Sequence, residues 1–286
     1  LSLDQVLAFE KRHKDKYNFI YKPALIYEHI DTMLDNKLLE DLRVRQAILM
    51  AIDRKAISEK LFEGKQPVAD GPINQLDPMF TPDTRHYPYD AAQARKLLDE
   101  AGFKDIRSGA RHNAQGERLS IEIATSAGNR VRELVAQVIQ SQLRQVGVDL
   151  RIKAEPMRVF SEALNRRQFT GLAMYAWVQS PQGVPRSTLH SKEIPSAENA
   201  WSGQNYPGYR NPAMDAALDA AERELDPAKR RALFADIQRI HAEDLPVLPL
   251  FFRVDPFVIP KQLKGVTPTG HLNSSTLWIE QWRWEN

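Results

Sequence analysis

Glu28, His29 and Asp31 bring two carboxylates and an imidazole within four positions, and such groups can transfer protons or bind a metal ion. The residues before them, Ala24 to Tyr27, are mostly apolar and are typical of a β-strand. Neighbouring residues of a strand point to opposite faces of a sheet, so Glu28 and His29 would be kept apart. We therefore expect no catalytic site at this sequence.

The other residues that could do chemistry form no known pattern. None of the seven histidines lies in an H-E-x-x-H sequence or another metal-ligand spacing. The chain has no cysteine, which excludes thiol catalysis, cysteine-ligated zinc and disulfides. Glycine-rich phosphate-binding sequences are absent as well. The sequence therefore predicts no catalytic residue, no metal site and no cofactor.

Two segments combine aromatic and polar side chains as small-molecule sites do, with apolar walls and a few fixed polar groups. One follows a short apolar run at residues 172–177, and the other lies between residues 201 and 206. The predicted ligand-binding residues are Trp177, Gln179, Ser180, Trp201, Asn205 and Tyr206. The alternative is that Trp177 and Trp201 are aromatic residues of the core.

The segment from Asp41 to Ile57 predicts the two helices around which the rest is organised. Its apolar residues recur at the spacing of one helical face, and this face includes Ile48 and Ile52. Asp41 is suited to cap the first helix, and Asp53 is suited to cap a second one. The sequence thus predicts two short helices that meet at a corner on the core.

The remaining periodicity predicts an α/β fold, because strand and helix patterns alternate. Pro23 is expected to split one early extended region into two strands, at residues 19–21 and 24–27. Residues 65–89 and 180–209 are proline-rich and predict long surface loops. Strands are predicted at residues 119–124, 148–152, 172–177 and 245–252, and helices at 90–101, 129–146, 157–167, from 212 and from 226.

Composition narrows the function further. The 286 residues carry a net charge of +2 with acidic and basic residues interleaved, which argues against a nucleic-acid partner. No apolar run reaches the ~18 residues that a membrane-spanning helix needs. The chain begins at Leu1 without a signal peptide, so either the protein is cytoplasmic or its true amino terminus lies upstream. We expect the second.

Three motifs resemble those of the extracytoplasmic solute-binding proteins of the peptide/nickel class, family 5, which feed ABC importers. The first is D-x-R-V-R-Q-A followed by A-I-D-R, at residues 41–54. The second is Y-D-x-x-x-A-x-x-L-L-x-x-A-G-F, at residues 89–103, and the third is N-P-x-x-D continued by P-x-x-P-L, at residues 211–250. The chain is similar to the carboxy-terminal lobe of such a receptor.

This resemblance implies a periplasmic-binding-protein-like lobe with a mixed sheet flanked by helices. Residues 1–36 would be an entry segment that belongs partly to a missing lobe, 37–252 the substrate-binding lobe, and 253–286 a return segment. It also implies a monomer that binds a small molecule or oligopeptide between two lobes, in the periplasm or elsewhere outside the cytoplasm. The closed form would deliver this ligand to an ABC permease.

The resemblance differs at one point that concerns the ligand. Peptide receptors of the family place an aspartate after the strand that corresponds to Tyr175-Ala176-Trp177-Val178, and it pairs with the peptide's amino group. Gln179 and Ser180 stand there instead. A neutral residue cannot form the charge-assisted bond that would hold an ammonium group. We therefore expect binding that does not depend on a free amino terminus.

Two other functions remain open on the sequence. A sensory or chaperone-like binding protein could use the same fold without a transporter, because fold does not determine function. A hydrolase would require a cluster of buried carboxylates or histidines in a pocket.

Overall fold

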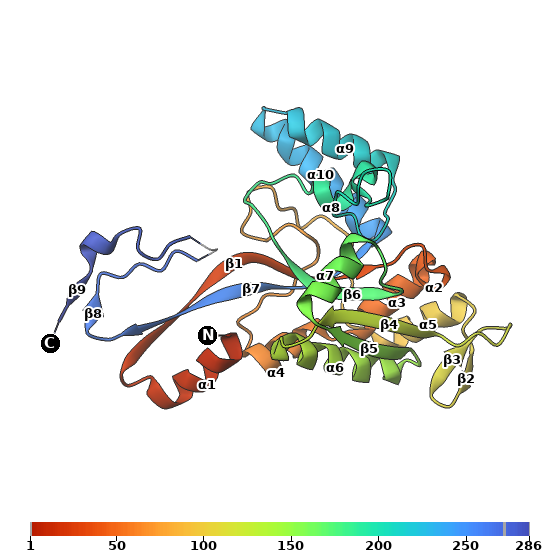
Figure 1. Cartoon of the computed structure of the whole chain (residues 1–286), viewed down its shortest axis with the longest axis horizontal. Helices are drawn as coiled ribbons and strands as arrows, with labels where there is room; N and C mark the ends of the chain where they lie inside the picture. The colour runs from red at the N-terminus through yellow and green to blue at the C-terminus, as the bar shows by residue number, and fades with distance from the viewer. Residues whose placement is uncertain (1, 271–272, 286) are drawn as a thin grey trace.

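The computed structural model describes residues 2–270 and 273–285, and its centre is a five-stranded sheet (Figure 1). The strand order is β5-β4-β6-β1-β7. Strands β4, β5 and β6 run parallel, whereas β1 is antiparallel to both β6 and β7. These strands are β1 (Tyr17–Thr32), β4 (Ser120–Ser126), β5 (Asp149–Glu155), β6 (Leu172–Val178) and β7 (Val247–Pro260). The mixed sheet confirms the predicted α/β class.

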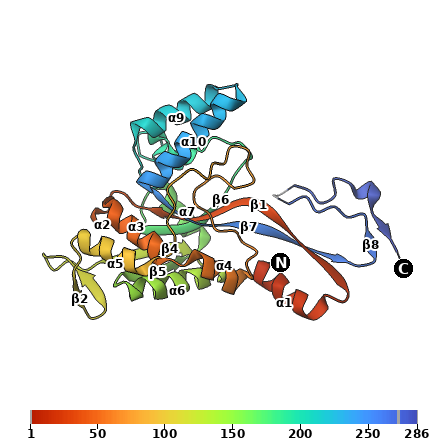
Figure 2. The ribbon, with the colours of Figure 1, turned by 180° about the vertical axis from the view of Figure 1, so that it is seen from behind.

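Helices cover both faces of this sheet, as Figures 1 and 2 show. Helices α3, α4, α5 and α6 lie on one face, and α7 and the α9–α10 pair lie on the other. The helices are α1 (Leu3–His13), α2 (Lys37–Glu40), α3 (Leu42–Ala51), α4 (Arg54–Phe62), α5 (Ala91–Glu100), α6 (Arg130–Gln145), α7 (Met157–Asn165), α8 (Arg186–Leu189), α9 (Pro212–Arg223) and α10 (Pro227–Asp244), with 3-10 turns η1 (Ser191–Glu193) and η2 (Ile279–Gln281).

The predicted organising helices are confirmed as α3 and α4. The carboxylate of Asp41 accepts the Arg43 N–H, and that of Asp53 accepts the Ala56 N–H, so both aspartates cap a helix. Ile48 is fully buried in the largest core cluster, between the sheet and helices α3 to α6. Burial of this apolar face is what holds the helix pair against the sheet.

The charged residues of the α3 motif also have a structural task. Arg45 is buried, and its guanidinium group donates to the carbonyl oxygens of Leu39, Asp244 and Leu245 at 2.6 to 3.0 Å. Two of these carbonyls lie at the end of α10, where helical carbonyls have no partner within the helix. Arg45 thus joins α3 to the helix pair on the other side of the sheet.

The expectation of two strands split by Pro23 was wrong. β1 is one strand of 16 residues, and its pairing with β7 shifts register between Pro23 and Tyr27. Proline cannot donate to a ladder, and a bulge at this point lets the strand continue past it. The strand predicted at 245–252 is likewise longer, because β7 continues to Pro260 alongside β1.

The far halves of β1 and β7 form a two-stranded arm that extends from the body (Figure 1). At its end, β8 (Leu263–Lys264) pairs with β9 (Arg283–Trp284). A second small hairpin pairs β2 (Asp105–Arg107) with β3 (Ala110–His112). Among the helices described, none combines the length and the apolar character needed to cross a membrane.

Candidate functional site

A pocket of about 210 Å³ opens on the face of the sheet that carries α7 and α10. Its walls come from β1, the end of β6 and the segments around α8, and also from the loop before α5 and from α10. The lining residues that the argument uses are Tyr27, His29, Asp31, Trp177, Gln179 and His241. A pocket in which distant segments of one chain meet has the usual form of a small-molecule site.

One wall is formed by three of the residues predicted from the sequence. Trp177, Gln179 and Ser180 all line the pocket, at the point where β6 leaves the sheet. The Gln179 N–H donates to the Leu25 carbonyl oxygen at 2.8 Å, which fixes the backbone beside β1. The side chain of Gln179 therefore stands on a backbone held by the sheet.

The floor of the pocket is formed by β1, whose residues Tyr27, His29 and Asp31 alternate along the strand and share one face. Tyr27 stacks on the His29 ring at a centroid distance of 4.9 Å, and Tyr175 meets that ring edge-on at 4.5 Å. The Tyr175 hydroxyl donates to Asp31 Oδ2 at 2.5 Å, and His29 Nε2 lies 3.4 Å from Asp31 Oδ1. The floor is thus polar and rigid.

Helix α10 contributes His241, which is buried beside this floor. Burial, with a smaller effect of His29, lowers the pKa of His241 to about 4, so the ring is neutral at pH 7. Burial also raises the pKa of Tyr27, with Asp31 adding to the effect, so the Tyr27 phenol keeps its proton. His241 and Tyr27 therefore bring no charge to this floor at pH 7.

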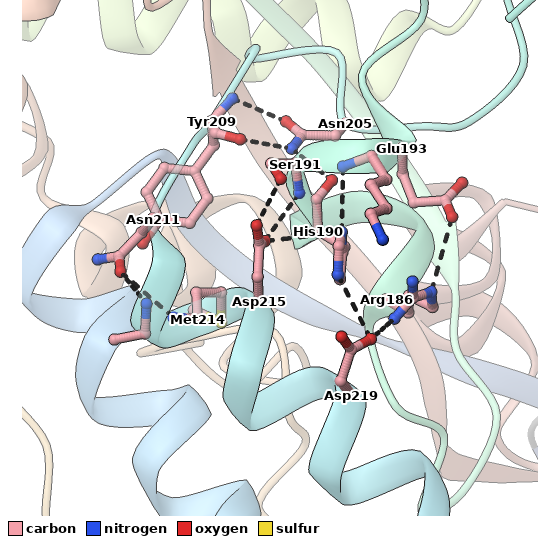
Figure 3. A network of polar contacts seen from close by, with 12 residues as sticks. Arg186, His190, Ser191, Glu193, Asn205, Tyr209, Asn211, Met214, Asp215 and Asp219 are labelled. Carbon is pink, nitrogen blue, oxygen red and sulfur yellow. Dashed lines mark hydrogen bonds and ion pairs between the residues drawn. The ribbon is translucent and has the colours of Figure 1, made fainter.

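A polar network behind the opposite wall holds residues 186–209 in place (Figure 3). His190 Nδ1 accepts the Lys192 N–H at 3.0 Å, which leaves its proton on Nε2, directed at Asp219 Oδ1 at 3.4 Å. Arg186 also donates to Asp219, and this bond lowers the pKa of the carboxyl group. These contacts tie the pocket wall around α8 to helix α9.

The second predicted segment, residues 201–206, does not join the pocket as a unit. Asn205 is fully buried, and its amide bonds to the His190 carbonyl and to both backbone groups of Tyr209 (Figure 3). Tyr206 packs behind Trp177 at 6.0 Å between ring centroids. Trp201 lies under the Arg166 guanidinium group. None of these three residues is among those that line the pocket, whereas their neighbour Gln204 is.

Glu28 faces the other side of the sheet, as strand alternation predicted. It accepts hydrogen bonds from Arg132 on α6 at 3.0 Å and from Arg253 on β7 at 2.7 Å. Burial alone would raise the pKa of Glu28, but the two guanidinium groups outweigh burial and the pKa lies below its usual value. Glu28 and both arginines line a separate pocket of about 240 Å³ on this face.

Tyr27, His29, Asp31 and His241 form a cluster at the pocket floor, here called the floor cluster. Sequence reasoning missed this cluster because His241 lies far from the other three residues in the sequence. Glu28-His29-Ile30-Asp31 was set aside as non-catalytic, and no sequence pattern linked it to His241, some 210 positions later. The available signal was the alternation of Tyr27, His29 and Asp31, which puts three polar side chains on one face of an otherwise apolar strand. Only the tertiary fold brings α10 to that face.

The floor cluster lacks the geometry of a hydrolytic centre. His29 Nδ1 is bonded to the Tyr27 carbonyl oxygen at 3.0 Å, and no serine or threonine hydroxyl bonds to either histidine in the described part of the chain. A nucleophile needs a base within hydrogen-bonding reach. Across residues 2–270 and 273–285, no group of three or more histidines and acidic residues is placed to hold a metal ion.

Curated relatives of this chain include peptide-binding proteins. The oligopeptide-binding protein AppA of Bacillus subtilis is 27% identical over 283 residues, which is 97% of this chain and 51% of that protein. Di/tripeptide-binding protein 2 of Pseudomonas aeruginosa is 28% identical over 262 residues, 90% of this chain and 45% of that protein. The chain thus spans about half the length of these curated relatives.

Solved structures of solute-binding proteins share the fold of this chain. The oligopeptide-binding protein of Thermus thermophilus, complexed with a pentapeptide, superposes with a TM-score of 0.83 at 33% identity, covering 93% of this chain and 48% of that one. NikZ from Campylobacter jejuni, in complex with Ni(L-His), gives 0.82 at 25% identity, covering 97% and 55%. These relatives are solute-binding proteins and not enzymes.

The match to a family model covers most of the chain. Residues 1–194 match the family model described as "Bacterial extracellular solute-binding proteins, family 5 Middle". The predicted motifs at residues 41–54 and 89–103 lie inside this match. The chain therefore belongs to the family 5 bacterial extracellular solute-binding proteins.

Proposed function

We propose that the full-length protein captures a peptide-like or other small polar solute in the pocket described above, and delivers it to an ABC permease. The observation that carries this proposal is the pocket wall of Trp177, Gln179 and Ser180 at the end of β6, in a chain of this family. Trp177 supplies an apolar surface, and Gln179 offers both a donor and an acceptor. The expected location is the periplasm or another extracytoplasmic space.

The length of the relatives supports a two-lobed receptor. We propose that residues 37–252 form the substrate-binding lobe, and that residues 1–36 and 253–286 contact a further lobe of the longer protein. The arm of β1 and β7 would connect the two, although β7 passes residue 252 without a break. A ligand would favour the closed state through contacts that exist only when the lobes meet. The receptor would act as a monomer.

The proposal is tested by identifying what the full-length protein carries. Small molecules released from the purified protein by denaturation should be enriched in one solute, identified by mass spectrometry. Trp177→Ala should lower the calorimetric affinity for that solute at least tenfold, whereas Trp201→Ala should change it less than threefold. Release of no specific solute, or equal effects of both substitutions, would refute solute capture in this pocket. Hydrolysis of the solute by the protein would favour an enzyme instead.

The transporter as partner is tested separately. A sensory or chaperone-like protein of the same fold would bind a solute without a permease. Neighbouring genes for a permease and an ATPase, together with loss of uptake of the identified solute when this gene is deleted, are the expected results. Unchanged uptake in the deletion strain would favour the sensory alternative.

A further inference from the structure

Three buried polar atoms at the pocket floor have no hydrogen-bond partner within the described residues: Tyr27 Oη, His29 Nε2 and His241 Nδ1. Each belongs to a side chain that is at most 3% exposed, and all three residues line the pocket. Buried polar atoms of folded proteins are almost always paired, so three unpaired atoms at one place indicate a site for a bound molecule.

The proton on His29 indicates what such a molecule must offer. His29 Nδ1 lies 3.0 Å from the carbonyl oxygen of Tyr27, which can only accept, so Nδ1 carries the proton. In the ring that carries this one proton, the lone pair of Nε2 faces Asp31 Oδ1, 3.4 Å away, and that oxygen is also an acceptor. Two facing acceptors repel each other unless a donor lies between them. An N–H or O–H group of a ligand would satisfy both.

The charge of the pocket also favours a ligand group that donates a hydrogen bond and carries no negative charge. Two carboxylates, Asp31 and Asp77, line it, and no lysine or arginine does so among the described residues. Desolvation holds the pKa of His241 near 4, so this ring does not supply a positive charge at pH 7. A carboxylate buried here would lose its hydration without gaining a cationic partner, which is costly.

We propose that Tyr27, His29, Asp31 and His241 form a specificity subsite that binds a hydrogen-bond-donating group without negative charge and rejects carboxylates. The donor can be the N–H of an ammonium or amide group, or the hydroxyl of a sugar. This inference rests on the proposed solute-binding function and assigns the chemical class of the ligand. Trp177 stands beside the subsite as the wall for the apolar body of that ligand.

The chemical class of the ligand can be tested with small probe molecules that share one apolar side chain or one sugar ring and differ in charge. Leucinamide, N-acetylleucinamide and N-acetylleucine share one apolar side chain and are cationic, neutral and anionic. Methyl glucoside and methyl glucuronoside form a second pair, neutral and anionic. Binding to the full-length protein would be measured by calorimetry, and its place by shifts of the imidazole nitrogen signals of His29 and His241. We expect the cationic or neutral members of at least one set to bind at least tenfold more tightly than the anionic member.

Two tyrosine variants separate binding from folding. Tyr27→Phe removes a hydroxyl that has no partner among the described residues, so it should leave the unfolding midpoint unchanged. It should lower the affinity for the probe that binds at least fivefold. Tyr209→Phe removes a hydroxyl that donates to Asp244 outside the pocket, so it should lower the midpoint and leave probe affinity unchanged. Asp31→Asn should lower the affinity for leucinamide at least tenfold. Its control is Asp255→Asn, which changes a carboxylate on the other side of the sheet and should leave this affinity unchanged.

Each result has a defined meaning. Binding of anionic probes as tight as that of neutral ones, or unchanged affinity in both Tyr27→Phe and Asp31→Asn, would overturn the subsite. Failure of every probe to bind and to shift the histidine signals would overturn it too. Binding of methyl glucoside alone would support the subsite with a hydroxyl ligand and refute a peptide-like one. Absence of any released solute, with probes still bound at the floor, would refute the proposed solute capture and leave the subsite standing.

Discussion

Glu28 and His29 are neighbours in sequence, yet each serves a different face of the sheet. His29 belongs to the ligand pocket, whereas Glu28 lies between the guanidinium groups of Arg132 and Arg253. Glu28 thus joins α6 to β1 and β7 beneath the pocket floor. A carboxylate in this position acts on stability, because removal of one partner leaves the other charges buried without compensation.

Replacement of Glu28 by glutamine should therefore lower the free energy of unfolding by about 3 kcal/mol at pH 7. The folded-state pKa lies below the usual value of 4.5, so the stabilisation is present in full above pH 4.5 and is lost as the pH falls through the folded-state pKa. Urea titrations of both proteins across pH 7 to 3 would measure this. Glu285→Gln, which removes a surface pair with Arg283, is the control and should change stability by less than about 0.5 kcal/mol.

Burial of His241 leads us to expect a second effect of pH on the free energy of unfolding, in a higher pH range than that of Glu28. Its pKa is 6.5 in the unfolded chain and about 4 in the fold, so between these values only the unfolded chain takes up the proton. Stability should fall by up to roughly 3 kcal/mol as the pH drops from 6.5 to 4. His241→Gln should flatten this part of the curve, and His86→Gln, at an exposed position, should not. An identical slope in His241→Gln and wild type would disprove the assignment.

At the scale of elements, the helices could be predicted because their signals are local. Asp53, Asp90 and Asn129 each stand at the start of an apolar helical pattern, and each caps a helix in the structure. The continuity of β1 through Pro23 could not be predicted, since it depends on pairing with β7, more than 200 residues away. The pocket floor needed β1 and α10 together, so the sequence indicated the Trp177 wall but not His241.

Shortening the side chains on the buried face of α3 should lower the free energy of unfolding by a large amount. Ile48 is fully buried and Ile52 is 1% exposed, and both belong to the main core cluster. Alanine at either position would leave a cavity between the helix and its neighbours. Each substitution should lower the free energy of unfolding by ~2–5 kcal/mol, measured by denaturant titration. Ile106→Ala, at an exposed position of β2, is the control. An unchanged midpoint in both core variants would contradict this packing.

At the scale of the whole molecule, the segment beyond the β1–β7 arm has several exposed apolar side chains close together in the sequence. Leu277, Trp278, Ile279 and Trp284 are all exposed there. Apolar residues that cluster on an exposed surface usually mark an interface. Since the relatives are about twice as long as this chain, the proposed second lobe is a natural partner for that segment.

This proposal can be tested by comparing two exposed leucines in two lengths of the protein. Leu277, 57% exposed, lies in the segment beyond the arm, and Leu225, 91% exposed, lies between α9 and α10. Leu277→Ser should lower the free energy of unfolding of the full-length protein by roughly 1–3 kcal/mol, because its side chain would be buried against the second lobe. The same change in the 286-residue chain should have little effect, and Leu225→Ser should have little effect in either. Equal effects of Leu277→Ser in both lengths, measured by denaturant titration, would show that the second lobe does not cover this segment.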